Sequence, residues 1–191
     1  MKKSLLWLAL LAASVPTLHG CAAVVVGGAA TGVLIAEDRR KAGVYLEDQE
    51  IELRAMDRLR GAFGEKAASV STVSYNHHVL VYGQVQDEAS RAKATEIIKA
   101  IPNVVRVHNE TTISGITSYT SDANDASITT KVKYRLSQSD KVSASHVKVV
   151  TEAAVVYLMG LVTREEAEAA GQVAAGTSGV VKVVKLFEYI N

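Results

Sequence analysis

The chain carries one sequence pattern twice, with the second copy 77 residues after the first. Each copy opens with three apolar residues at intervals of four: Ile51, Ala55 and Leu59, then Ile128, Val132 and Leu136. This interval places the three side chains of each copy in one stripe along a helix. Asp48 and Asp125 stand three residues before the stripes, where we expect the residue that caps a helix N-terminus. The repeat therefore predicts two domains of the same fold.

Each copy continues with the same order of elements. An extended segment comes first, followed by a strand of β-branched and aromatic residues, an Ala/Glu/Lys-rich helix and a closing Val-rich strand. In the first copy these elements are residues 70–74, 79–85, 87–100 and 104–107, and in the second copy they are 147–151, 156–162, 164–175 and 180–183. Each copy is therefore predicted to fold in the order αββαβ.

Glycines and turns give further expectations. Gly83 and Gly160 occupy matching places near the end of the second predicted strand, where a glycine marks a bulge or a close approach of a helix. We therefore expect a structural role for both. Residues 75–78 and 152–154 are expected to form the hairpin turns. The segment 152–154, Glu-Ala-Ala, has no Gly or Asn to supply a positive φ, so a longer or irregular turn is expected there.

The N-terminus predicts export and a lipid anchor. Lys2 and Lys3 precede an apolar run at residues 5–13, which is typical of a secretory signal and too short to span a bilayer. The segment Leu18-His19-Gly20-Cys21 resembles the lipobox of bacterial lipoproteins, which implies that Cys21 is lipidated and becomes the first mature residue. The alternative is an ordinary signal peptide with an incidental cysteine. Ala22, rather than Asp, implies by the same resemblance export to the outer membrane.

The rest of the chain divides by composition. Residues 22–36 are small and apolar but number only about 15, fewer than the roughly 20 that a membrane span needs, so we expect a tether at the membrane surface. The predicted divisions are a signal peptide at 1–20, a lipid-anchored tether at 21–46, a first domain at 47–113, a polar linker at 114–123 and a second domain at 124–191. Domains of about 65 residues are near the lower limit for independent folding, which favours packing of one against the other.

Charge and motif content exclude several classes of function. The chain has 21 basic and 20 acidic residues, and loss of the two lysines in residues 1–20 leaves 19 basic residues. A nearly neutral mature protein is not suited to bulk nucleic-acid binding. Cys21 is the only cysteine. No predicted helix carries histidines at i and i+4, and no nucleophile elbow, P-loop or dinucleotide fingerprint is present. We therefore expect no metal site, no cofactor and no enzymatic activity.

The first helices of the two copies differ in charge. In the first copy the helix mixes signs, whereas from Ser127 to Arg135 the second carries Lys131, Lys133 and Arg135 without an acid, together with Tyr134. A basic helix face with an aromatic residue is typical of contact with an anionic membrane surface. A solvated basic face is the other interpretation, and the residues alone leave both open.

The repeated pattern resembles the BON domain (bacterial osmotically inducible and nodulation). The resemblance rests on the repeated stripe, the strand with Gly83 or Gly160 and the Val two residues later, the Ala/Glu helix and the closing Val-Val-Arg/Lys-Val. Residues 128–132 (ITTKV) and 157–167 (YLMGLVTREEA) are similar to the second domain of dual-BON outer-membrane lipoproteins of Gram-negative bacteria. The implied fold is α+β, with two tandem domains that each pack two helices on a three-stranded mixed sheet.

The resemblance also implies a function. BON domains are implicated in phospholipid binding, and in the dual-BON lipoproteins the first helix of the second domain is the expected contact. The residues expected to bind anionic phospholipid here are Ser127, Lys131, Lys133, Tyr134 and Arg135. Ser127 departs from relatives that place a large aromatic residue there. The implied protein is a non-enzymatic lipoprotein on the periplasmic face of the outer membrane that supports its integrity. The alternative is a protein-interaction module of the outer-membrane assembly or division machinery.

Overall fold

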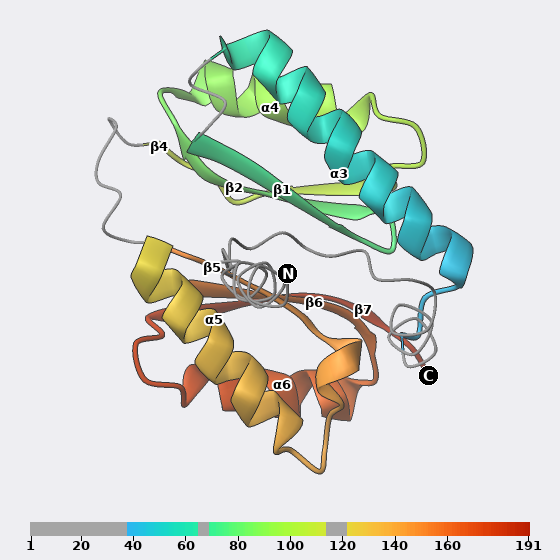
Figure 1. Ribbon diagram of the computed structural model, residues 1–191, viewed down its shortest axis with the longest axis vertical. Coiled ribbons are helices and arrows are strands. Elements are labelled where there is room, and N and C mark those ends of the chain that lie inside the picture. Colours follow the sequence, from blue (N-terminus) through green and yellow to red (C-terminus); the bar gives the residue numbers. More distant parts are fainter. Residues whose placement is uncertain (1–37, 65–68, 114–121) are drawn as a thin grey trace, which may run out of the picture. The chain divides into compact units, whose positions relative to one another are not determined.

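The computed structural model describes residues 38–64, 69–113 and 122–191, so the predicted signal, Cys21 and residues 22–37 of the predicted tether lie outside the described residues. The first domain consists of α3 (Ala42–Phe63), β1 (Val70–Tyr75), β2 (His78–Val85), α4 (Glu88–Lys99), β3 (Arg106–Asn109) and β4 (Thr112–Ile113) (Figure 1). The second consists of α5 (Asp122–Ser137), the 3-10 turn η2 (Ala144–His146), β5 (Lys148–Glu152), β6 (Val155–Val162), α6 (Arg164–Ala175) and β7 (Lys182–Tyr189). The order αββαβ is confirmed in both.

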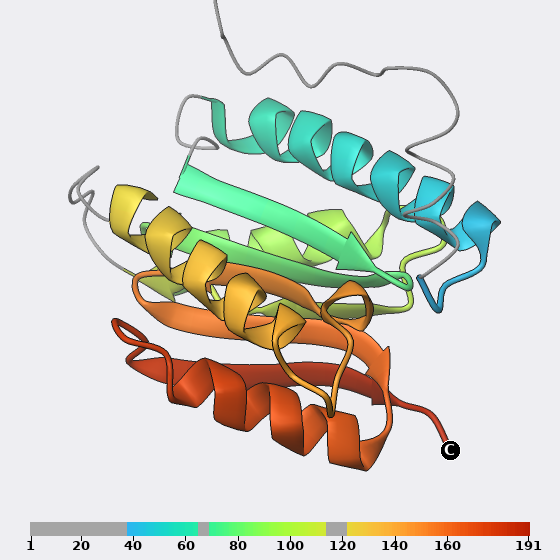
Figure 2. The ribbon, with the colours of Figure 1, turned by 60° about the horizontal axis from the view of Figure 1, so that its bottom comes forward.

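The first sheet is mixed and has β2 at its centre. β1 pairs with β2 antiparallel, from Val70 opposite Gly83 to Tyr75 opposite His78. β3 and β4 both pair with β2 in parallel, and β4 continues the register of β3 after a two-residue interruption. They therefore act as one interrupted closing strand. The helices α3 and α4 cover one face of this sheet (Figures 1 and 2).

The second sheet has the same topology, with β5 antiparallel and β7 parallel to the central β6. α5 and α6 cover one of its faces (Figure 2). The closing strands β3 and β7 begin two residues later than predicted. Val105 and Val181 are exposed, and their backbone N–H groups donate to carbonyls of the hairpin turns, His77 and Ala154, before the parallel ladder starts.

The central strands are buried on both faces, which explains their continuous apolar sequences. In β2, Val79 and Val81 pack with the helices, whereas Leu80 faces the other way. β6 alternates in the same manner, with Val156 and Leu158 toward its helices. A third buried cluster draws on strands of both domains: Tyr75, Leu80, Val150, Tyr157 and Met159. The two domains therefore share part of their core.

The prediction that Asp48 and Asp125 cap their helices is wrong. α3 begins at Ala42 and α5 at Asp122, so both aspartates lie inside a helix and face the core. Each carboxylate accepts the two backbone N–H groups of a hairpin turn. The Asp48 carboxylate accepts hydrogen bonds from the backbone N–H groups of Asn76 and His77, each at 2.8 Å. The stripe in each helix therefore begins with a polar residue that ties the helix to the hairpin.

The prediction of a long or irregular second turn is also wrong. β5 and β6 are joined by only Ala153 and Ala154, and both have positive φ. Two central residues with positive φ form a type I′ turn, which normally requires Gly or Asn. Here Asp125 accepts the N–H of Ala153 at 2.7 Å and that of Ala154 at 2.9 Å. These two charge-assisted hydrogen bonds offset the backbone cost of the alanines.

Gly83 and Gly160 lie where the backbone just before the first strand of each sheet passes close to the central strand. A Cβ at Gly83 would collide with the carbonyl oxygen of Ser69, and one at Gly160 with that of His146. Gly83 also has a φ of +102°. At Gly83 the approaching carbonyl comes from the residue before β1, and at Gly160 it comes from the last residue of η2. The β1–β2 register is continuous from His78 to Gly83, where the pairing ends.

Candidate membrane-binding surface

The outward side of α5 is built by the same periodicity that buries its inner side. Asp125, Ile128, Val132 and Leu136 face the core. A helix turns by about 100° per residue, so Ser127, Lys131 and Tyr134 form a ridge on the side opposite that stripe. All three are exposed, and Tyr134 is 66% exposed. We call Ser127, Lys131 and Tyr134 the α5 ridge.

Lys131 and Lys133 lie on opposite flanks of Tyr134, because one precedes it by three residues and the other by one. Both lysines are exposed. Within the described ranges, no carboxylate lies within ion-pair distance of either ammonium group. The two charges are therefore available to an external anion.

Arg135 belongs to a different surface. Its Nη1 donates to the Thr177 hydroxyl at 3.0 Å, and its guanidinium lies against Gly176, the residue that ends α6. The structure therefore brings Ser127, Lys131, Lys133 and Tyr134 together on the outside of α5. It directs Arg135 toward the C-terminal end of α6, where a cation interacts favourably with the helix dipole.

Acidic groups gather at the opposite end of α5. Asp122 and Asp125 lie in its first turn. Burial raises the pKa of Glu152, and the nearby charges of Asp125 and Asp122 raise this pKa further. Acids at the N-terminal end and bases at the C-terminal end both match the helix dipole. The polarity of α5 therefore confines its basic surface to the last two turns.

The first domain has a ridge at the matching positions of α3, but its charges are paired. Glu50, Arg54 and Asp57 correspond to Ser127, Lys131 and Tyr134 at the 77-residue offset. The Arg54 guanidinium forms an i, i+4 ion pair with the Glu50 carboxylate. This ridge has no aromatic residue and carries two acids against one base, so it is not suited to an anionic surface.

The histidines that the structure describes do not assemble into a metal site. His77 Nε2 lies 2.6 Å from a Glu47 oxygen, and the rings of His78 and His108 are 5.9 Å apart. Burial lowers the pKa of both His78 and His108. Among residues 38–64, 69–113 and 122–191, no group of three or more His, Cys, Asp or Glu side chains could hold a metal ion. No helix in that part of the chain is long and apolar enough to cross a bilayer.

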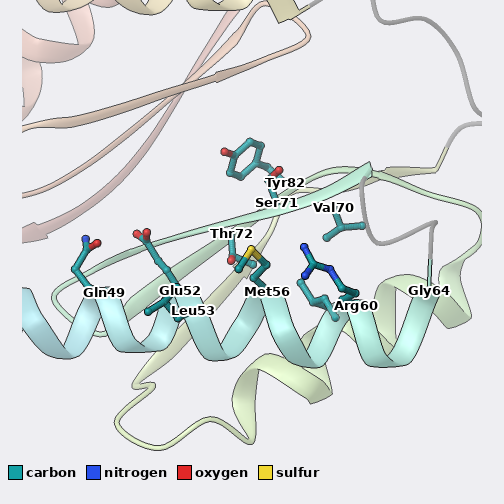
Figure 3. Close-up of a pocket in the computed structure, with 11 residues that line it drawn as sticks. Gln49, Glu52, Leu53, Met56, Arg60, Gly64, Val70, Ser71, Thr72 and Tyr82 are labelled. Carbon is teal, nitrogen blue, oxygen red and sulfur yellow. The ribbon is translucent and has the colours of Figure 1, made fainter. Parts of the chain in front are cut away.

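Sequence reasoning missed a groove in the first domain. It lies between α3 and β1, has a volume of about 740 Å³ and is shown in Figure 3. Its helical wall carries Leu53 and Met56, which are 62% and 49% exposed. The signal was present in the sequence, because these two residues form a second apolar stripe with Leu46, at intervals of seven and three.

Comparisons with known proteins agree with the repeat. The BON domain model matches residues 47–115 and 124–191. The chain is 36% identical over 185 residues to Outer membrane lipoprotein DolP of Haemophilus influenzae, covering 96% of each chain. It is 31% identical to the 21 kDa hemolysin of Actinobacillus pleuropneumoniae, covering 81% of this chain and 80% of that protein. A solved C-terminal domain of CdsD from Chlamydia trachomatis aligns with a TM-score of 0.30 and 13% identity, covering 75% of this chain and 67% of that one.

Proposed function

Because the chain belongs to the family of dual BON-domain outer-membrane lipoproteins, we propose that it is a non-enzymatic protein that binds anionic phospholipid through α5 of its second domain. On this proposal, Cys21 carries the lipid anchor and the protein supports the integrity of the outer membrane. Lipid binding is the step that the described residues can be tested for directly.

The observation that carries the proposal is the unpaired basic surface around Tyr134. Lys131 and Lys133 flank an exposed aromatic ring, and in the described ranges no acidic partner neutralises them. Each basic side chain near an anionic bilayer contributes about 1 kcal/mol, and a tyrosine ring is suited to the headgroup region. The same positions of α3 lack both properties, so the proposal assigns lipid contact to the second domain alone.

The anchor increases the effect of a weak lipid affinity. A chain held at a membrane by Cys21 meets lipid at a high effective concentration, so binding by α5 becomes an intramolecular event. A ridge with Ser127 in place of a large aromatic residue contributes little apolar insertion. We therefore expect electrostatic contact at the headgroup level rather than deep insertion, with affinity that falls steeply as salt rises.

Vesicle sedimentation tests this proposal. The mature chain with Cys21→Ser is mixed with phosphatidylcholine vesicles that contain either no anionic lipid or added phosphatidylglycerol or cardiolipin. Binding should require the anionic lipid and weaken between low and physiological salt. Lys131→Glu with Lys133→Glu should reduce the affinity at least about 30-fold, since two contributions of about 1 kcal/mol are lost and replaced by repulsion.

A matched control keeps the change of net charge constant. Arg54→Glu with Arg58→Glu alters two basic residues on the corresponding helix of the first domain and should leave vesicle binding unchanged. Equal binding to neutral and anionic vesicles would contradict the proposal. So would an equal loss of affinity in the two double variants, because the effect would then follow net charge rather than the α5 surface.

A further inference from the structure

One wall of the groove between α3 and β1 is formed by α3, whose apolar Leu53 and Met56 lie between polar residues, and the other wall is the edge strand β1. In Figure 3, the side chains of Met56 and Arg60 reach from α3 toward β1, and Tyr82 lies beyond the strand. Leu59 closes the base of the groove, where it is 2% exposed. The groove therefore combines apolar side chains of α3 with polar residues and lies beside the free edge of the first sheet.

The free edge of β1 offers unused backbone hydrogen-bonding groups. Ser74 directs its N–H away from β2, because that group donates to Glu52 Oε1 at 2.8 Å. Alternate residues of an antiparallel strand point their backbone groups the same way, so Val70 and Thr72 also direct theirs outward. In the described part of the chain, no hydrogen bond engages these groups. The edge therefore presents two donors and two acceptors next to the groove.

β1 also lacks the charges that normally protect a sheet edge. The structure describes four edge strands of at least four residues, and β1 is the one among them that has no Asp, Glu, Lys or Arg. β5, its counterpart in the second domain, begins with Lys148 and ends with Glu152. β3 carries Arg106, and β7 carries two lysines and a glutamate. Among these longer edge strands, the uncharged one is therefore the strand that adjoins the groove.

The groove is specific to the first domain because its apolar wall is absent from the second. Leu53 and Met56 correspond to Thr130 and Lys133 at the 77-residue offset. Two charges mark the ends of the groove in the first domain. Glu52 lies beside Ser74 at one end, and Arg60 lies toward Gly64 at the other. An occupant that runs along β1 therefore meets an acidic group at one end and a basic group at the other.

We propose that this groove binds an extended segment of a partner polypeptide, which pairs with Val70 and Thr72 as an added strand and packs apolar side chains on Leu53 and Met56. Addition of a strand uses the open backbone groups for affinity and the groove for alternate side chains. The charges at its ends select a segment with a basic residue near Glu52 and an acidic residue near Arg60. This interaction is independent of lipid binding by α5.

The test uses the mature chain with Cys21→Ser, immobilised on a surface. A library of displayed random nine-residue peptides is selected for binding to it. Enriched peptides should alternate apolar and polar residues, and each should slow the exchange of the Val70 and Thr72 amide hydrogens when it binds. The double variant Leu53→Thr with Met56→Lys gives the groove the residues of the second domain, and it should weaken peptide binding at least tenfold. The control variant is Leu46→Thr, because Leu46 lies on the same stripe but outside the groove. This substitution should leave peptide binding unchanged.

A second variant tests the strand itself. Thr72→Pro removes an outward N–H that β2 does not use, so the hairpin is retained and peptide binding should fall. N-methylation of the peptide at the paired residues should have the same effect. The proposal would be overturned if no peptide were enriched, or if enriched peptides bound the groove variants as well as the original chain. A dimer that dissociates on Leu53→Thr with Met56→Lys would overturn it too, because a second copy would then occupy the groove.

Discussion

α3 and α5 have matching inner faces and different outer faces. On the inner side, each helix presents an aspartate followed by three apolar residues, and each aspartate holds a two-residue hairpin turn. On the outer side, α3 carries an internally paired ridge and an apolar wall, whereas α5 carries unpaired lysines around a tyrosine. The fold is therefore specified by residues that the proposed function does not use, and the two helices differ at their outer positions.

The largest expected effect tests the shared inner face. Asp48 accepts the turn N–H groups, the Ser74 hydroxyl at 2.6 Å and the Arg40 guanidinium at 2.7 Å. Asp48→Ala leaves Arg40, whose side chain is only 7% exposed, without one of its two acidic partners. We expect a loss of about 3–5 kcal/mol in the free energy of unfolding. Urea unfolding combined with amide exchange measures this loss for the first domain.

The corresponding substitution in the second domain sharpens the comparison. Asp125 accepts the backbone N–H groups of Ala153 and Ala154, both of which have positive φ. Asp125→Ala should therefore lower the free energy of unfolding of the second domain by about 1–3 kcal/mol, as measured by the same urea unfolding. An unchanged free energy of unfolding would contradict a role for Asp125 in holding the alanine turn.

A transplant between the outer ridges comes next in size. Ser127→Glu, Lys131→Arg and Tyr134→Asp give α5 the paired ridge of α3. Binding to anionic vesicles should fall about 30-fold, because the cation becomes paired and a second anion is added, each at about 1 kcal/mol. The free energy of unfolding should change little, since these side chains are exposed. Retained lipid binding in the transplant would show that the ridge is not the contact.

The two hairpin turns should respond differently to glycine. Ala154 has a φ of +63°, a conformation that costs a residue with a Cβ roughly 1–2 kcal/mol. Ala154→Gly should therefore raise the stability of the second domain by up to about 1 kcal/mol, after the greater freedom of glycine in the unfolded chain is included. His77→Gly should raise the stability of the first domain by less, because this substitution also removes the contact between His77 and Glu47. Thermal unfolding of both variants measures the difference.

The smallest effect concerns acid stability. Hydrogen bonds from Arg39, at 2.7 and 2.8 Å, and the cap formed with Thr163 hold the pKa of Glu166 at about 2, and the first domain has Ala89 at that position. A lowered pKa stabilises the fold above pH 4.5, and this contribution is lost as the pH falls from 4.5 toward 2. Arg39→Ala should raise the pKa of Glu166, which carbon NMR titration of its carboxyl group would show.

The sequence predicted the elements whose side chains repeat at a fixed interval. α6 occupies the predicted residues 164–175, and the central strands begin within one residue of their predicted starts. The start of α3 was not predictable from periodicity, because residues 42–47 contribute no buried side chain. In the sequence, an aspartate before an apolar helical stripe can be either the residue that caps the helix or a buried hydrogen-bond acceptor. Only the position of the hairpin turn distinguishes the two roles. The alanine turn was missed because its stabilising group lies 28 residues earlier in the chain.

The candidate surfaces were predictable to different degrees. Lys131, Lys133 and Tyr134 follow from helical spacing, since charge and exposure are local properties of α5. The separation of Arg135 depends on Thr177, which is distant in sequence. The groove of the first domain needed the position of β1 relative to α3. A strand edge is open or covered according to tertiary packing, which a single sequence does not report.

The buried aspartates have a consequence for the order in which each domain folds. Burial of the Asp48 or Asp125 carboxylate is favourable only when the N–H groups of a hairpin turn replace its hydrogen bonds to water. The alanine turn, in turn, is stable only when the Asp125 carboxylate accepts its N–H groups. Helix and hairpin therefore depend on each other and should form in one cooperative step. The partners are fewer than 30 residues apart, so the loop that must close is short. We expect the first helix and hairpin of each domain to form its folding nucleus, before the second helix and the closing strand join it.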